Sequence, residues 1–389
     1  MQGFAGEAAG DEPRAVMVAQ NVLSAGGNAV DAATALYFSL AVTLPSTATL
    51  GGGGTCLVHE KHGNVTRVVE FPAVAATGGR IPAAIPANVR GFYALQATYG
   101  KFRWASLLAP AELMAERGVM VSRALANDLA IAAPRLAADP AARQIFFHPD
   151  GKVLAEGDLM RNYDLAAVIA SLRRNPGSLY AGGLQRRFAD AARSIGANVT
   201  VRDLSDTRPR FVAGTQVAVG DDTAVLPPGD GVAELVRGGA AREVRSAAPS
   251  AGTGFVVLDS KGDAVACGIT ANRLFGDGRV APGTGIVLAA PPKPGQVAAV
   301  PGMVVNMPTG EVHFAGAAGG GNAAAALAAT LVATSRHGQG IDRAVAAASV
   351  GGSHVNAFHC QSGRASAARC RIATDPRGYG FAVTVGQGG

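Results

Sequence analysis

The chain has 389 residues, which fits one large domain or two ordinary ones, and 48% of them are hydrophobic, enough for a sizeable core. Only 16% are charged and 5% aromatic, and the net charge of +6 is spread without a basic stripe, so we expect no nucleic-acid binding. The chain has no run of about 18 apolar residues, so we predict no transmembrane segment. Met1 is followed by small and acidic residues, which do not form a signal peptide.

Helical periodicity dominates the first half of the chain. Residues 12–25 place Val16, Ala19 and Leu23 on one face, and Gly26-Gly27-Asn28 is a typical helix stop. A second helix is expected over 29–44, before Pro45. Further helical patterns cover residues 92–99, 104–117, 121–136, 164–174 and 184–196, with a short turn at 203–204.

Strands are predicted between and after these helices. The four glycines at 51–54 do not suit a strand interior, permit close backbone approach, and lead into a strand at 56–59. A turn at Gly63-Asn64 joins that strand to 65–69. Later strands are expected at 217–219, 223–226, 253–259, 264–270, 303–305 and 312–314, followed by closing helices at 323–336 and 340–348.

This order predicts an α+β protein in which mostly antiparallel sheets pack between helical layers. No linker interrupts the pattern, so we treat residues 1–389 as a single domain. No internal repeat is present.

Four cysteines bear on the compartment. Cys56 and Cys267 lie in strand-like runs and are interpreted as small core residues. Cys360 and Cys370 flank a polar loop, which favours a disulfide over two free thiols and hence an oxidising compartment. Their spacing does not suit a zinc site, although His354 and His359 are near, and we expect neither a metal nor another cofactor.

Several short motifs occur in a fixed order along the chain. They are Gly26-Gly27-Asn28-Ala29-Val30-Asp31, Gly51-Gly52-Gly53-Gly54, Asn272-Arg273-Leu274-Phe275-Gly276, Pro282-Gly283-Thr284-Gly285 and Gly319-Gly320. Their order and spacing, from about residue 12 to about residue 350, resemble those of the gamma-glutamyltransferase (gamma-glutamyltranspeptidase) family. Any one glycine-rich motif is weak, whereas the ordered set is specific.

The resemblance implies a four-layer αββα sandwich of the N-terminal-nucleophile (Ntn) hydrolase type. In that family the precursor cleaves itself before a Thr, whose hydroxyl then attacks while its own amine acts as base. A Gly-Gly pair stabilises the oxyanion, which assigns Gly319 and Gly320 here. By the same correspondence Thr270 is a catalytic candidate, Asn272 a substrate-binding candidate, and residues 1–252 and 253–389 correspond to the large and small subunits.

The chain departs from the family where the nucleophile belongs. That position is Gly252, the next is Thr253, and the family's following His is Gly254. Either the nucleophile is lost, or Thr253 serves after a one-residue slip that turns a strand residue to the opposite face. We name Thr253 as the candidate nucleophile, and a structural strand Thr is the alternative.

The family's donor-binding positions are also altered. The carboxylate-gripping Arg corresponds to Gly78, with Arg80 two residues on. The adjacent serines correspond to Ala298 and Ala299, and the Asn-Asn-Asp segment to the apolar run 289–292. Burying a carboxylate or an ammonium without a partner costs several kcal/mol, on the order of a lost salt bridge. The helical stretch between Pro228 and Thr253 is shortened as well.

Two functions follow from these departures. One is a pseudoenzyme: a scaffold with an eroded active site that binds or assembles with a protein partner. The other is an active Ntn amidohydrolase or gamma-glutamyl transferase that uses Thr253 after autocleavage on a small gamma-glutamyl or amide substrate. The family is usually exported, and with the Cys360–Cys370 staple this favours a periplasmic or extracellular location.

Overall fold

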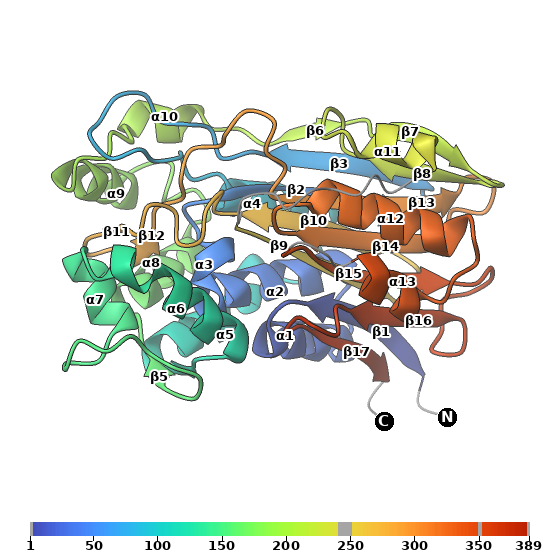
Figure 1. Cartoon of the computed structure of the whole chain (residues 1–389), viewed down its shortest axis with the longest axis horizontal. Helices are drawn as coiled ribbons and strands as arrows, with labels where there is room; N and C mark the ends of the chain where they lie inside the picture. Colours follow the sequence, from blue (N-terminus) through green and yellow to red (C-terminus); the bar gives the residue numbers. More distant parts are fainter. Residues whose placement is uncertain (1–2, 240–250, 349–351, 387–389) are drawn as a thin grey trace.

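Two stacked antiparallel sheets form the centre of the protein in the computed structural model, which describes residues 3–239, 251–348 and 352–386 (Figure 1). The first sheet has the strand order β17-β1-β9-β10-β2-β3-β6. Its strands are β1 (Phe4–Gly10), β2 (Gly53–Glu60), β3 (Val65–Phe71), β6 (Arg210–Val212), β9 (Gly252–Asp259), β10 (Ala264–Thr270) and β17 (Phe381–Gly386).

The second sheet has the order β16-β15-β14-β13-β8-β7. Its strands are β7 (Thr215–Val219), β8 (Asp222–Leu226), β13 (Ala299–Asn306), β14 (Glu311–Gly319), β15 (His354–Cys360) and β16 (Cys370–Thr374). Two small ribbons, β4 (Val119–Met120) with β5 (Leu159–Met160) and β11 (Val280–Ala281) with β12 (Ile286–Val287), lie outside both sheets.

Helices cover the outer face of each sheet (Figure 1). On the first sheet lie α1 (Pro13–Ser24), α2 (Ala29–Thr43) and α4 (Asn88–Tyr99). The same hydrophobic core includes residues of α3 (Pro45–Ala48), α5 (Trp104–Arg117), α6 (Arg123–Leu136), α7 (Pro140–Phe146), α8 (Tyr163–Arg174), α9 (Gly183–Ser194) and α10 (Val201–Asp206). The second sheet is covered by α11 (Val232–Gly238), α12 (Ala323–Ser335) and α13 (Ile341–Ala348). The fold is therefore the expected four-layer αββα sandwich.

Alternation along β9 shows how the layers are filled. Phe255 and Val257 belong to the core under α2, whereas Val256 and Leu258 belong to the core between the sheets. Because successive strand side chains point to opposite faces, odd-numbered positions of β9 face the helices and even-numbered ones face the second sheet. This alternation decides which of two adjacent residues can reach a site between the sheets.

The start of α2 follows its sequence signal closely. The Asn28 side chain accepts from the Asp31 N–H at 2.9 Å, and the Asp31 carboxylate accepts from the Asn28 N–H at 2.9 Å. This reciprocal capping box satisfies two donors that a helix start otherwise leaves unpaired. Every residue of α2 is buried, as its apolar composition predicts.

Three sequence expectations need correction. Gly53 and Gly54 are part of β2. The strand needs glycine at this point because neighbouring backbone is close: a Cβ on Gly53 would sit 2.1 Å from the Ala73 nitrogen. Strands β15, β16 and β17, rather than helices alone, close the chain, and β17 pairs with β1, which was not predicted. These segments are short or rich in Ala and Gly, so only pairing with residues far away in the chain makes them strands.

The cysteines form two cross-strand disulfides. Cys360 and Cys370 are joined between β15 and β16, as expected. Cys56 and Cys267 are buried, but the interpretation as free core residues was wrong, since they face each other across β2 and β10 and are bonded. The second bond links residues 211 positions apart, which the sequence alone could not pair.

Candidate functional site

Gly252 begins β9 and, as an even-numbered position, faces the second sheet. A Cβ atom built on Gly252 would lie 1.8 Å from the carbonyl oxygen of Ala298 and 2.9 Å from the Cβ of Ala299. Ala298 directly precedes β13 and Ala299 is its first residue, so the obstacle is backbone rather than a movable side chain. Gly252, which the motif spacing led us to match to the family nucleophile, thus has no side chain and no room for one.

Thr253 faces the other way, toward the helical layer. It is 0% exposed, and its hydroxyl donates to Asp11 Oδ2 at 2.6 Å. The same carboxylate oxygen accepts from the Gly254 N–H at 3.4 Å. A one-residue slip therefore does not place Thr253 where Gly252 points.

Asp11 is the centre of a partly buried polar cluster beside Thr253. His354 Nε2 lies 2.7 Å from Asp11 Oδ2, and the Asn356 side chain donates to Asp11 Oδ1 at 2.7 Å and to the Gly254 carbonyl at 2.8 Å. The loop after β1 supplies Asp11, and β15 supplies His354 and Asn356. Pairing of β1 with β9, and packing of β15 on β9, brings the four residues together.

The two charged members hold each other ionised. Burial acts most strongly on Asp11 and opposes its charge, but His354 and the hydrogen bonds from Thr253 and Asn356 bring its pKa below the usual value. Burial likewise opposes the charge on His354, yet Asp11, with Asp128 and Asp375 farther away, raises its pKa to about 9. Both shifts favour a carboxylate–imidazolium pair at neutral pH, in which 28% of the His354 side chain and 13% of the Asp11 side chain are exposed.

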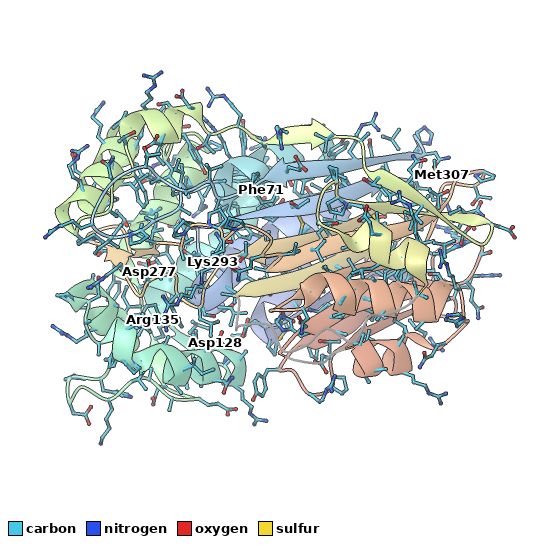
Figure 2. All side chains as sticks on the ribbon, turned by 45° about the horizontal axis from the view of Figure 1, so that its top comes forward. Phe71, Asp128, Arg135, Asp277, Lys293 and Met307 are labelled. Atoms are coloured by element: carbon cyan, nitrogen blue, oxygen red, sulfur yellow. A yellow bond between two sulfur atoms is a disulfide. The ribbon has the colours of Figure 1, made fainter. Side chains whose placement is uncertain are left out.

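A second carboxylate, Asp128 of α6, lies within electrostatic reach of that pair and is labelled in Figure 2. Ser46 of α3 donates to Asp128 Oδ2 at 2.5 Å. Burial raises the pKa of Asp128 to about 6, against smaller opposing effects of Ser46 and His354. The region therefore holds two carboxylates of different acidity around one imidazolium.

Thr270 and Asn272 lie at the end of β10, where Thr270 pairs with Gly252. The Thr270 hydroxyl donates to the Ala251 carbonyl and accepts from the Asn272 N–H, the latter at 2.7 Å. Asn272 has a φ of 62° and donates its side-chain N–H to the Ala290 carbonyl at 2.8 Å. Both polar side chains thus fasten neighbouring loops to β10.

Gly319 is the last residue of β14, next to Gly252, and Gly320 follows it. The Gly320 N–H donates to the Ala298 carbonyl at 2.9 Å. A Cβ on Gly319 would lie 2.3 Å from the Gly252 carbonyl oxygen and 2.7 Å from His354 Nε2. The structure therefore gathers Gly252, Thr270, the Gly319-Gly320 pair and His354 in one region, whereas Arg80 is exposed and packs against Gly196.

No sequence pattern marks Asp11, Asn356 or Asp128 as site residues, and His354 stands out in the sequence only as a neighbour of the cysteines. Asp11 precedes Glu12-Pro13, which signals only a helix start, and the Glu12 carboxylate does cap α1 by accepting from the Ala15 N–H at 2.9 Å. Residues 11 and 356 are joined across almost the whole chain. No local pattern could have paired them.

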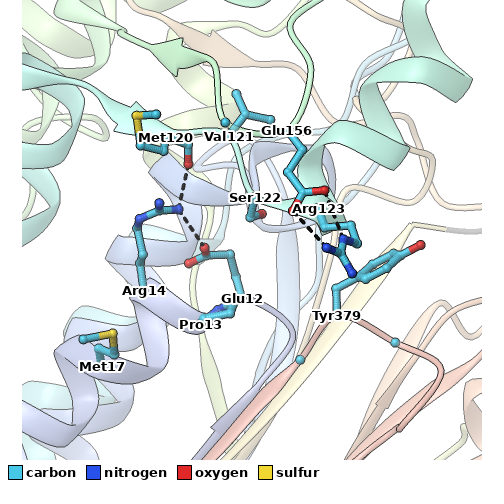
Figure 3. Close-up of a pocket in the computed structure, with 13 residues that line it drawn as sticks. Glu12, Pro13, Arg14, Met17, Met120, Val121, Ser122, Arg123, Glu156 and Tyr379 are labelled. Carbon is cyan, nitrogen blue, oxygen red and sulfur yellow. Dashed lines mark hydrogen bonds and ion pairs between the residues drawn. The ribbon is translucent and has the colours of Figure 1, made fainter.

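An open cavity of about 690 Å³ lies beside the start of α1 (Figure 3). Arg123 and Glu156 form an ion pair on its wall at 3.0 Å, and Arg14 donates to the Met120 carbonyl at 2.7 Å. Met17 and Tyr379 add apolar surface. Among the described residues, no group of three or more His, Cys, Asp or Glu side chains could hold a metal ion, and no helix is long and apolar enough to cross a membrane.

Solved structures that share this fold include an acylase and a gamma-glutamyltranspeptidase. Cephalosporin acylase from Bacillus halodurans superposes with a TM-score of 0.79, covering 100% of this chain and 97% of that chain, at 18% identity, which supports the fold alone. The gamma-glutamyltranspeptidase of Helicobacter pylori superposes with a TM-score of 0.54 over 58% of this chain and 73% of that chain, at 24% identity.

The sequence itself identifies the family. The model of the gamma-glutamyltranspeptidase family matches residues 15–234, more than half of the chain, so the protein belongs to that family. The "glutathione hydrolase proenzyme" of Escherichia coli K12 is 29% identical over 51% of this chain, and "glutathione hydrolase 7" of Bos taurus is 33% identical over 50%. The aligned parts span only 38% and 32% of those two relatives.

The matched part of the chain ends before β9. The family model stops at residue 234, ahead of Gly252, Thr253 and Thr270. The roles carried over to these positions therefore depend on the order and spacing of the motifs and on the geometry described above.

Proposed function

We propose that this protein is a gamma-glutamyltranspeptidase-family pseudoenzyme: a stable αββα scaffold that serves in binding or assembly with a protein partner. The observation that carries the proposal is Gly252. Glycine has no hydroxyl to attack a carbonyl, and the Ala298 carbonyl oxygen occupies the space that a nucleophilic side chain needs. Loss of the nucleophile removes the acyl-enzyme step on which the family's chemistry depends.

The other parts of the family's machinery support the same proposal. The Gly320 N–H already donates to the Ala298 carbonyl, so it is not free to stabilise an oxyanion. Ala298 and Ala299 replace the substrate-binding serines, and no acidic side chain occurs at 289–292 to receive an ammonium group. A gamma-glutamyl group would bury both of its charges without partners, which opposes binding.

The alternative function is an active Ntn amidohydrolase or gamma-glutamyl transferase that cleaves itself at Gly252–Thr253. The hydrogen bond from the Thr253 hydroxyl to Asp11 favours it, because a carboxylate is then in place to accept the hydroxyl proton. Complete burial of Thr253 opposes it, since a substrate must reach the nucleophile. We rank this function second.

The two disulfides favour a periplasmic or extracellular location, because cytosolic thiols are usually kept reduced. We further propose that residues 1–252 and 253–389 act as one unit even if the chain is cut between them. Strand β9 lies between β1 and β10, and the Cys56–Cys267 bond joins the two parts covalently.

Intact mass under denaturing and reducing conditions tests the proposal. Reduction is needed because Cys56–Cys267 would keep two fragments together and disguise a cut. We expect one chain of 39.0 kDa after long incubation, and no release of 4-nitroaniline from gamma-glutamyl-4-nitroanilide. Two fragments that meet at Gly252–Thr253, absent in Thr253→Ala, together with turnover, would refute it in favour of the alternative.

A further inference from the structure

Three polar side chains, two from strands and one from a loop, lie close together at one end of the second sheet. The Asp222 carboxylate begins β8 and lies 2.7 Å from His313 Nδ1, on β14. The other ring nitrogen, His313 Nε2, lies 3.5 Å from the hydroxyl of Ser362, which belongs to the loop between β15 and β16. Met307 marks this end of the sheets in Figure 2, far from Asp128, which lies within electrostatic reach of His354.

The backbone aims His313 at this point. Val304 pairs with Phe314 and Val305 pairs with Val312, so His313 has no partner and forms a β-bulge in β14. A bulge redirects the side chain of its extra residue and is enriched next to active sites. Asn306, at the end of β13, donates to Asp222 Oδ1 at 2.9 Å and so fixes the carboxylate that holds the imidazole.

The Cys360–Cys370 disulfide holds Ser362 in place. It closes the loop at the last residue of β15 and the first of β16, two residues from Ser362. Within the loop the Gln361 N–H donates to the Arg369 carbonyl at 2.9 Å, and the Arg369 guanidinium donates to the Ser362 carbonyl. Ser362 itself is exposed, whereas His313 is largely buried, with 13% of its side chain exposed.

We propose that Ser362, His313 and Asp222 form a second, serine-based acyl-transfer site that accepts short acyl groups from small activated esters. The arrangement has the three roles of a Ser-His-Asp triad: a hydroxyl, an imidazole that takes its proton, and a carboxylate that orients the imidazole. A gap of 3.5 Å between hydroxyl and imidazole is consistent with a resting site, because such hydrogen bonds often tighten only when substrate is bound. This site shares no residue with the Gly252 region.

Acyl transfer at this site has two halves, acylation of Ser362 and hydrolysis of the acyl-serine. The Ser362 Oγ forms a bond to the ester carbonyl carbon as its proton passes to His313 Nε2, and Asp222 stabilises the resulting imidazolium. The carbon–oxygen bond to the alcohol or phenol then breaks, and the leaving oxygen takes the proton from His313. Water repeats the sequence on the acyl-serine and releases the acid.

Glu311 restricts which substrates this site can accept. Its Oε2 accepts from the Gly363 N–H at 3.0 Å and lies 3.5 Å from His313 Nε2. Gly363 directly follows the nucleophile, the position from which a backbone N–H commonly stabilises an oxyanion. An incoming carbonyl oxygen must displace Glu311 from that N–H, and the adjoining hollow is shallow, so only small esters with good leaving groups should react.

Acylation by 4-nitrophenyl acetate tests the proposal. The full-length oxidised protein should release about one equivalent of 4-nitrophenolate in a fast phase, and peptide mapping should place the acetyl group on Ser362. Ser362→Ala should abolish that phase, and His313→Gln should slow it about 100-fold, the size of a general-base contribution. Ser366→Ala, in the same disulfide loop, should leave it unchanged.

A fluorophosphonate probe and removal of the Cys360–Cys370 disulfide by substitution provide independent measurements. The probe should phosphonylate Ser362 with loss of fluoride, and the Cys360→Ser/Cys370→Ser variant should react at least about tenfold more slowly, because the loop no longer holds Ser362 beside His313. Circular dichroism confirms that each variant is folded. Acetyl groups found only on lysines, or equal labelling of Ser362 in wild-type protein and His313→Gln, would overturn the proposal.

Discussion

Asp11→Asn removes the negative charge at the centre of the polar cluster around Thr253, and its effect should depend on pH. The change keeps the size of the side chain but leaves the His354 imidazolium without its counter-ion. Removing one partner of a fully buried ion pair costs about 3–5 kcal/mol, and the lower end of that range applies here because 28% of the His354 side chain is exposed. We therefore expect the free energy of unfolding at pH 7.5 to fall by about 3 kcal/mol.

The pH dependence follows from the pKa of His354, which folding raises from 6.5 to about 9. At about 1.4 kcal/mol per pKa unit, this shift contributes about 3.5 kcal/mol of stability when it is complete. Because the folded-state pKa is the higher one, the contribution is complete below pH 6.5 and is lost as the pH rises through 9. From pH 7.5 to 9.5 the wild-type protein should lose about 2 kcal/mol.

Urea unfolding at these two pH values measures the effect, with the midpoint and the slope fitted together. The buried acids with raised pKa values, Glu7 at about 7 and Asp128, Asp230 and Asp259 at about 6, are mostly ionised above pH 7.5 and contribute little in this window. In Asp11→Asn the loss should shrink below about 0.5 kcal/mol. Asp190→Asn, at a carboxylate 70% exposed, is the matched control. A variant that loses as much stability as wild type over this range would refute the reasoning.

Three further predictions address other positions. Gly252→Thr should restore no gamma-glutamyl hydrolysis. It should lower the free energy of unfolding, measured in urea, by about 1–3 kcal/mol, because its Cβ meets the Ala298 backbone. Wild-type stability would show that β9 and β13 can move apart freely. Glu7→Gln should leave the free energy of unfolding unchanged at pH 4.5 and raise it by about 2–3 kcal/mol at pH 8. Burial raises the pKa of Glu7 to about 7, so its charge is unfavourable above that value and the substitution removes it. Equal effects at both pH values would contradict this. Replacing Cys56 and Cys267 by Ala should lower the urea midpoint more than replacing Cys360 and Cys370, because the bonds close loops of 211 and 10 residues, and the reverse order would be inconsistent with the entropy argument.

The sequence alone determined the local elements and the family. Helical periodicity located α1, α2, α5 and α12 within a residue or two, because an amphipathic or wholly buried helix carries its pattern over several turns. Capping and turn signals, such as Asn28 with Asp31 and the turn at Gly63-Asn64, were equally local. The ordered glycine motifs identified the family and its αββα architecture before any contact was known.

Only the tertiary structure decided the rest. The face on which Thr253 lies, its burial against Asp11, and the lack of space at Gly252 depend on how β9 sits between β1 and β10 and against β13. Cys56 with Cys267, Asp11 with His354, and Ser362 with His313 and Asp222 are joined across separate strands. Such pairings are set by strand register and sheet stacking, which are properties of the whole chain, so no short stretch of sequence records them.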